Sequence, residues 1–138
     1  MATILVADDN ADLRELVKLH LQKNGFACVE ARSGTEVLNA LAAEKIDLVL
    51  MDLNMPELDG WEATVAIRSS QEFANTPVVA LTAYSLAGDR ARAKAAGFSC
   101  FHIKPIQFDE LLTDINRLLQ PTVEAAAIVG QQENNTSR

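Results

Sequence analysis

Apolar residues gather in short uninterrupted runs that recur along the chain. Three of these runs, ILVA, IDLVLM and VVAL, are almost entirely apolar instead of alternating with polar residues. Such runs are typical of strands that are covered on both faces, as in a parallel sheet. The pattern predicts strands at Ile4–Ala7, Ala27–Ala31, Ile46–Met51, Val78–Leu81 and Cys100–Ile103.

The segments between these runs repeat apolar residues every three or four positions, which is the pattern of amphipathic helices. Gly25 and Gly97 fall where helix C-caps are expected. Alternating strands and helices with right-handed crossovers predict an α/β fold, a doubly wound (βα)5 three-layer sandwich with a five-stranded parallel sheet. The apolar stripes of the first, second and last helices are Leu13, Leu16, Val17 and Leu21; Val37, Leu38 and Leu41; and Leu111, Leu112, Ile115, Leu118 and Leu119.

The length of 138 residues, 49% of them hydrophobic, indicates one globular domain. We expect it to span residues 1–120, with residues 121–138 forming a short flexible tail. No apolar run approaches the roughly 20 residues that cross a bilayer, and the N-terminus lacks the basic region of a signal peptide, so we expect a cytoplasmic protein without membrane insertion. The net charge of -7 argues against nucleic-acid binding.

The cysteines and histidines are not arranged in a known metal or redox motif. Cys28 and Cys100 each lie inside an apolar run, so we interpret both as buried free thiols without a chemical role. His20 is interpreted as a partly exposed helix residue. His102 is interpreted as a tolerated histidine on an edge strand, in preference to a pH sensor.

Polar side chains follow several of the predicted strands at the point where each strand ends. Asp8 and Asp9 end the first run, Asp52 ends the third, and Thr82 and Lys104 follow the fourth and fifth. In open parallel sheets the functional crevice lies beyond the carboxyl ends of the strands. The sequence therefore predicts that three carboxylates, a hydroxyl and an ammonium group face one crevice.

A single aspartate after a strand is usually a helix N-cap, and Asp9 or Asn10 could cap the first helix. Three neighbouring carboxylates are different, because they repel one another unless a cation compensates their charge. Hard oxygen ligands suit Mg²⁺ (or Mn²⁺), which often shares its coordination shell with a phosphate. We therefore favour a Mg²⁺ site at Asp8, Asp9 and Asp52 over three solvated side chains.

These motifs together resemble the receiver domain of two-component response regulators. The resemblance rests on DD at 8–9, LVLMDLNMPELDGWE around Asp52, VVALTA ending at 83, and FHIKP with Lys104, and it spans about Ile4 to Leu119. It implies the sheet order 2-1-3-4-5, which is the order known for the chemotaxis regulator. It also implies a signalling domain that assists its own phosphorylation and dephosphorylation, not an enzyme with an external substrate.

The resemblance implies a role for each residue of the crevice. Asp52 would be the phosphoacceptor, and Asp9, Asp52 and the main-chain carbonyl of Asn54 would hold Mg²⁺, with Asp8 acting through a metal-bound water. Lys104 would pair with the phosphoryl oxygens.

The resemblance also implies residues that respond to phosphorylation and residues that set the lifetime of the phosphorylated state. Thr82 would hydrogen-bond to the phosphoryl group, and Phe101 would be the aromatic residue whose rotamer reports the switch. Asn54 and Tyr84 would tune the lifetime of the acyl phosphate, because both border the approach of the hydrolytic water. We expect the Tyr84 ring to exclude that water and to make the phosphorylated state long-lived.

The implied partners are a sensor histidine kinase or a histidine phosphotransfer protein as donor, and an unknown output protein. The chain could also be a receiver that belongs to a larger hybrid kinase.

Two alternative functions have the same fold class. An aspartyl-nucleophile phosphatase would need a second carboxylate where Asn54 stands. A flavodoxin-like FMN binder would need a phosphate loop where Asp8 and Asp9 stand.

Overall fold

The computed structural model describes residues 1–83 and 90–120, and the predicted tail at 121–138 lies outside the described residues. Strands and helices alternate along the chain, as the apolar pattern predicts. The elements are β1 (Thr3–Ala7), α1 (Ala11–Lys23), β2 (Ala27–Ala31), α2 (Gly34–Ala43), β3 (Leu48–Asp52), α3 (Gly60–Ser69), β4 (Val78–Thr82), α4 (Arg90–Ala96), β5 (Cys100–Ile103) and α5 (Phe108–Leu118).

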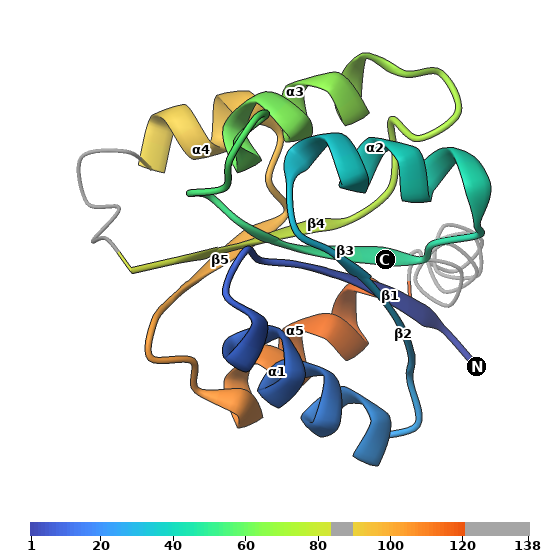
Figure 1. The fold of residues 1–138 in the computed structure, drawn as a ribbon, viewed down its shortest axis with the longest axis vertical. Helices are drawn as coiled ribbons and strands as arrows, with labels where there is room; N and C mark the ends of the chain where they lie inside the picture. The colour runs from blue at the N-terminus through green and yellow to red at the C-terminus, as the bar shows by residue number, and fades with distance from the viewer. Residues whose placement is uncertain (84–89, 121–138) are drawn as a thin grey trace, which may run out of the picture.

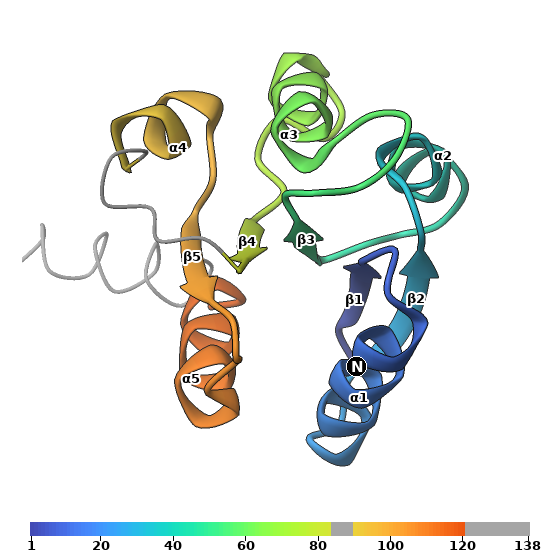
Figure 2. The ribbon, with the colours of Figure 1, turned by 60° about the vertical axis from the view of Figure 1, so that its left-hand side comes forward.

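The five strands form one parallel sheet in the order β2-β1-β3-β4-β5, which confirms the predicted fold. Helices α1 and α5 cover one face of the sheet, and α2, α3 and α4 cover the other (Figures 1 and 2). Each face therefore has its own apolar core. Leu50 and Ile115 belong to the core under α1 and α5, and Val49 and Ile67 belong to the core under α2, α3 and α4.

The strand boundaries shift slightly from those that the sequence predicts. β3 runs from Leu48 to Asp52 and β4 runs from Val78 to Thr82, so Asp52 and Thr82 are the last residues of their strands. Both side chains are therefore held by the strand backbone and not by a loop.

The predicted apolar stripe of α1 is wrong at Leu16, which is 46% exposed. The buried positions of that helix are Arg14, Val17 and Leu21, so Leu16 lies outside the face that packs on the sheet.

Local sequence signals set the helix ends. Asn10 is the N-cap of α1, since its side chain accepts a hydrogen bond from the Leu13 N–H. Asp59 and Glu62 form a reciprocal capping box at the start of α3. Gly25 follows α1 with φ of +89°, a left-handed conformation that suits glycine. None of the helices within the described ranges is long and apolar enough to cross a membrane.

Candidate functional site

Three carboxylates converge at the carboxyl ends of β1 and β3. These strands are adjacent and parallel, so Asp8, which follows β1, and Asp52, which ends β3, lie at the same edge of the sheet. Carboxylate oxygens of Asp8, Asp9 and Asp52 all lie within 4.8 Å of one another. Asp8 is 2% exposed and Asp52 is 5% exposed, whereas Asp9 faces solvent. The structure thus brings together the predicted acidic cluster.

Lys104, from the segment after β5, provides a positive charge within this cluster. Its Nζ lies 3.1 Å from Oδ2 of Asp8 and 3.5 Å from Oδ1 of Asp52. The backbone places it there, because the Lys104 N–H donates to the carbonyl of Thr82 at the end of the adjacent strand. One ammonium group therefore bridges two carboxylates that would otherwise repel each other.

Backbone N–H groups also contribute to the site. The Asn10 N–H donates to Oδ1 of Asp8 at 2.9 Å, and the Asn54 N–H donates to Oδ1 of Asp52 at 3.2 Å. Each carboxylate therefore accepts a hydrogen bond from the backbone of the residue two positions later, in the loop that follows its strand. These bonds orient the acidic side chains before any ligand binds.

The charge of Asp52 is poorly compensated by the protein alone. Burial, and next the negative charge of Asp8, raise the pKa of Asp52 from 3.8 to about 6. Lys104 and the Asn54 N–H act in the opposite direction but do not cancel this effect. The site therefore favours an additional cation.

The donor set fits a hard divalent cation. Each residue of the cluster offers a carboxylate oxygen, and exposed Asp9 leaves one side of the cluster open to water and to a phosphate group. Mg²⁺ prefers such sites, with few protein carboxylates, several waters and substrate oxygens. Asp8, Asp9 and Asp52 could thus hold Mg²⁺ or Mn²⁺, and the carbonyl of Asn54 belongs to the loop that follows Asp52.

The two predicted switch residues lie on the neighbouring strands. Thr82 is fully buried at the end of β4, where it pairs in register with Ile103 of β5. Phe101 of β5 is half-buried and packs against the core under α2, α3 and α4. Asn54, which is predicted to tune the lifetime of the acyl phosphate, has an exposed side chain. Tyr84 lies outside the described residues, so its predicted effect on hydrolysis stays a prediction.

The loop between β3 and α3 packs closely against the site. A Cβ atom on Gly60 would meet the carbonyl oxygen of Asp52 at 2.4 Å and the Cα of Leu53 at 2.9 Å. The Gly60 N–H also donates to the carbonyl of Leu53. Glycine at this position therefore allows the start of α3 to pack directly against the backbone of the predicted phosphoacceptor.

Arg14 is a site residue that the sequence interpretation missed. Its Nη1 donates to the carbonyl of Asp8 at 2.7 Å, and its Nε pairs with Glu30 of β2 at 3.0 Å. Arg14 is 9% exposed. A signal was available, because Arg14 lies three residues before Val17 and seven before Leu21, on the buried stripe of α1.

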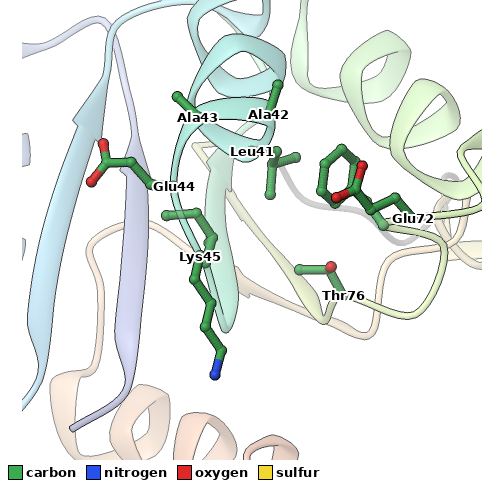
Figure 3. Close-up of a pocket in the computed structure, with 9 residues that line it drawn as sticks. Leu41, Ala42, Ala43, Glu44, Lys45, Glu72 and Thr76 are labelled. Atoms are coloured by element: carbon green, nitrogen blue, oxygen red, sulfur yellow. The ribbon is translucent and has the colours of Figure 1, made fainter.

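A separate hollow lies at the opposite end of the sheet and does not belong to this site. It measures about 400 Å³ and is lined by the end of α2, the segment before β3 and the segment before β4 (Figure 3). The Lys45 side chain extends away from Glu72 and Thr76 there (Figure 3). The hollow lies at the amino ends of the strands, so it is separated from the acidic cluster by the length of the sheet.

Known proteins that are similar to this chain belong to the family that the sequence motifs resemble. Residues 4–116 match the model of the response regulator receiver domain. The chain is 38% identical over 113 residues to the CAI-1 autoinducer sensor kinase/phosphatase CqsS of Vibrio cholerae, covering 81% of this chain and 16% of the kinase. It thus spans only a small part of that relative.

Two further relatives are similar over nearly their full length. The polar-differentiation response regulator DivK of Brucella ovis is 29% identical over 117 residues, with 85% of this chain and 95% of DivK covered. The structure of the response regulator TrrA of Thermotoga maritima, determined in complex with Mg(2+)-BeF, superposes with a TM-score of 0.77 at 34% identity. That superposition covers 86% of this chain and 100% of TrrA.

Proposed function

Because this chain belongs to the response regulator receiver domain family, we propose that Asp52 accepts a phosphoryl group from a phosphohistidine. The observation that carries this proposal is the position of Asp52, which is 5% exposed, ends β3 and lies beside Asp8, Asp9 and Lys104. Family membership also favours this function over an aspartyl-nucleophile phosphatase and over an FMN binder.

The proposed reaction is a nucleophilic displacement at phosphorus. A carboxylate oxygen of Asp52 attacks the phosphorus, a new O–P bond forms, and the P–N bond of the phosphohistidine breaks with its electron pair leaving on the imidazole nitrogen. Phosphoryl transfer requires alignment of the reacting groups and neutralisation of charge more than covalent chemistry by the protein. Asp52 is held in place for this attack by the Asn54 N–H and by β3.

The neighbouring side chains have distinct proposed roles. Asp8, Asp9 and Asp52 would hold Mg²⁺, with the carbonyl of Asn54, and the ion would supply positive charge to the phosphoryl oxygens. Lys104 would move from the carboxylates, 3.1 and 3.5 Å away, toward the new phosphoryl group. The domain would thus assist its own phosphorylation and dephosphorylation.

A small phosphodonor tests the phosphoacceptor directly. With acetyl phosphate and Mg²⁺, intact mass spectrometry should show one added phosphoryl group, and peptide mapping should place it on Asp52. Asp52→Asn should abolish labelling, and Asp9→Ala should abolish it by weakening metal binding. Asp12→Asn, on the exposed first turn of α1, is the matched control and should be labelled like the parent. Undiminished labelling of Asp52→Asn would rule out the assignment.

We also propose that phosphorylation switches a protein-binding surface around α4, β5 and α5. A hydrogen bond from Thr82 to the phosphoryl group would draw the end of β4 toward Asp52 and bias the rotamer of Phe101. A beryllofluoride complex, which stands in for the phosphoryl group, should shift amide resonances at Thr82 and at Cys100–Lys104 much more than those near Gly25. Shifts confined to the acidic cluster would instead indicate a passive phosphate carrier.

The proposed donor is a sensor histidine kinase or a histidine phosphotransfer protein. Support comes from CqsS, a sensor kinase/phosphatase that contains a segment 38% identical to this chain. The output partner would be a protein that distinguishes the two states of the switch surface. Transfer from a purified phosphorylated phosphotransfer protein to Asp52, lost in Asp52→Asn, is the expected result.

A further inference from the structure

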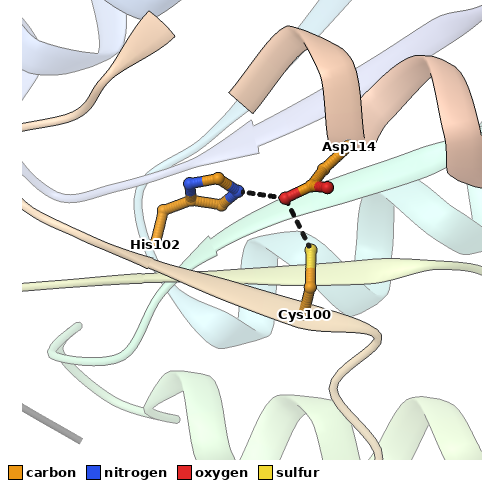
Figure 4. Close-up of side chains that lie close together, drawn as sticks. All are labelled: Cys100, His102 and Asp114. Carbon is orange, nitrogen blue, oxygen red and sulfur yellow. Dashed lines mark hydrogen bonds and ion pairs between the residues drawn. The ribbon is translucent and has the colours of Figure 1, made fainter. Parts of the chain in front are cut away.

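A second cluster of side chains that are able to ligate a metal lies between β5 and α5, apart from the acidic cluster. Cys100 and His102 are two residues apart on β5, so their side chains leave the same face of the strand, the face that α5 covers. Asp114 of α5 faces both of them (Figure 4). The three ligand atoms, Sγ, Nε2 and Oδ2, come from a soft thiol, an imidazole and a carboxylate.

The distances within this cluster are close to those of a tetrahedral zinc site. Oδ2 of Asp114 lies 2.8 Å from Nε2 of His102 and 3.8 Å from Sγ of Cys100, and one ligand atom from each residue lies within 4.8 Å of the others. Bond lengths to Zn²⁺ of about 2.0–2.3 Å predict ligand separations of about 3.4 Å for N···O and about 3.6 Å for S···O. Small side-chain rotations would therefore suffice.

The surroundings of the cluster suit a metal ion. The His102 side chain is 10% exposed and that of Asp114 is 30% exposed, so the ligands are shielded but can be reached. Arg117 donates to the other oxygen of Asp114, Oδ1, at 3.2 Å and so orients the carboxylate without occupying Oδ2. A hollow of about 390 Å³, lined in part by His102, Glu110 and Asp114, offers an entry path and room for a water as fourth ligand.

We propose that Cys100, His102 and Asp114 bind Zn²⁺, or a divalent transition metal of similar chemistry, with water in the fourth position. Three protein ligands of these types and one open position are typical of zinc sites that are not purely structural. Thiolate and carboxylate together neutralise the charge of the ion. Hard Mg²⁺ does not compete effectively here, because it disfavours thiolate ligands.

Binding changes the protonation of the cluster in a defined way. Without metal, burial and then the charge of Asp114 raise the pKa of Cys100 to about 11, so the group is a thiol near neutral pH. On binding, the S–H bond of Cys100 is broken, its proton passes to solvent, and the sulfur–metal bond forms with the electron pair left on sulfur. The Nε2–H of His102, which donates to Asp114, also gives up its proton while Nδ1 takes one from solvent, so that the neutral ring binds the metal through the Nε2 lone pair. The hydrogen bonds that Asp114 makes to His102 and Cys100 are then replaced by metal–ligand bonds.

Cobalt is the probe for this site, because a thiolate bound to Co²⁺ gives a charge-transfer absorption band in the near ultraviolet. The reduced protein, in saturating Mg²⁺ to occupy the acidic cluster, is titrated with Co²⁺. We expect a thiolate band that saturates at one equivalent and is removed by Zn²⁺. Absence of the band, or Co²⁺ binding without it, would overturn the proposal, and neither result depends on any variant.

The variants identify the ligands. Cys100→Ser should remove the band, while Cys28→Ser, which changes the other half-buried free cysteine, should retain it. His102→Gln and Asp114→Asn should each weaken Co²⁺ binding at least about tenfold, the loss that even an outer-shell partner can cause. Circular dichroism checks that each variant is folded. A band that survives in Cys100→Ser, or is lost in Cys28→Ser, would contradict this ligand set.

Discussion

Replacing Asp52 with asparagine should stabilise the metal-free domain, although it removes the proposed phosphoacceptor. The carboxylate is 5% exposed and lies beside Asp8, and these features raise its pKa from 3.8 to about 6. An acid whose pKa is raised by folding has a charged form that destabilises the folded state. Asparagine has no charge to bury, and its side-chain oxygen can still accept the hydrogen bond from the Asn54 N–H.

The magnitude follows from the pKa of Asp52. At about 1.36 kcal/mol for each pKa unit, the change from 3.8 to about 6 corresponds to about 3 kcal/mol above pH 6. Water penetration and side-chain relaxation lower the cost of a buried charge, so we expect a gain in the free energy of unfolding of about 1.5–3 kcal/mol. The destabilisation grows as the pH rises from 3.8 to 6, so the gain at about pH 5 should be about half of the gain at about pH 7.5.

The assay is urea denaturation of the parent and Asp52→Asn in EDTA, at about pH 7.5 and at about pH 5. Asp12→Asn is the matched control, since this exposed residue in the first turn of α1 should lose only about 0.3–1 kcal/mol of helix-dipole stabilisation. Added Mg²⁺ should stabilise the parent much more than Asp52→Asn. If Asp52→Asn is no more stable than the parent at about pH 7.5, or if its gain does not shrink at about pH 5, the electrostatic reasoning is refuted.

Two further predictions concern the support of the site. Gly60→Ala should destabilise the domain by about 1–3 kcal/mol in urea denaturation, because its Cβ would meet the carbonyl oxygen of Asp52 at 2.4 Å; an unchanged midpoint would contradict the close packing. Arg14→Met should weaken Mg²⁺ binding about tenfold in fluorescence or calorimetric titration, since Arg14 holds the Asp8 carbonyl at 2.7 Å. Exposed Arg32→Met is the control, and equal affinities of the two variants would exclude a positioning role.

The sequence alone determined most of the fold and the location of the acidic site. Continuous apolar runs predicted the parallel strands, because strands that are covered on both faces need apolar side chains on both. Asp8, Asp52 and Lys104 could be placed together without coordinates, because all carboxyl ends of a parallel sheet lie at one edge. The strand order came from the family resemblance and not from the apolar pattern.

Tertiary structure alone decided the contacts between elements that are distant in sequence. Periodicity indicates that a residue faces the core, but it does not tell which side chain of another element it meets. Arg14 lies on the buried stripe of α1, yet only the packing of α1 beside β2 brings it to Glu30 and to the Asp8 carbonyl.

The cluster on β5 and α5 shows the same limit. Cys100 and His102 have the spacing of one strand face, but Asp114 is brought to them by a helix whose position depends on the packing of the whole sheet face. The depth of Asp52, and therefore its raised pKa, likewise depends on neighbours from several elements. Charge burial and ligand geometry are properties of the assembled core, so no local pattern of residues specifies them.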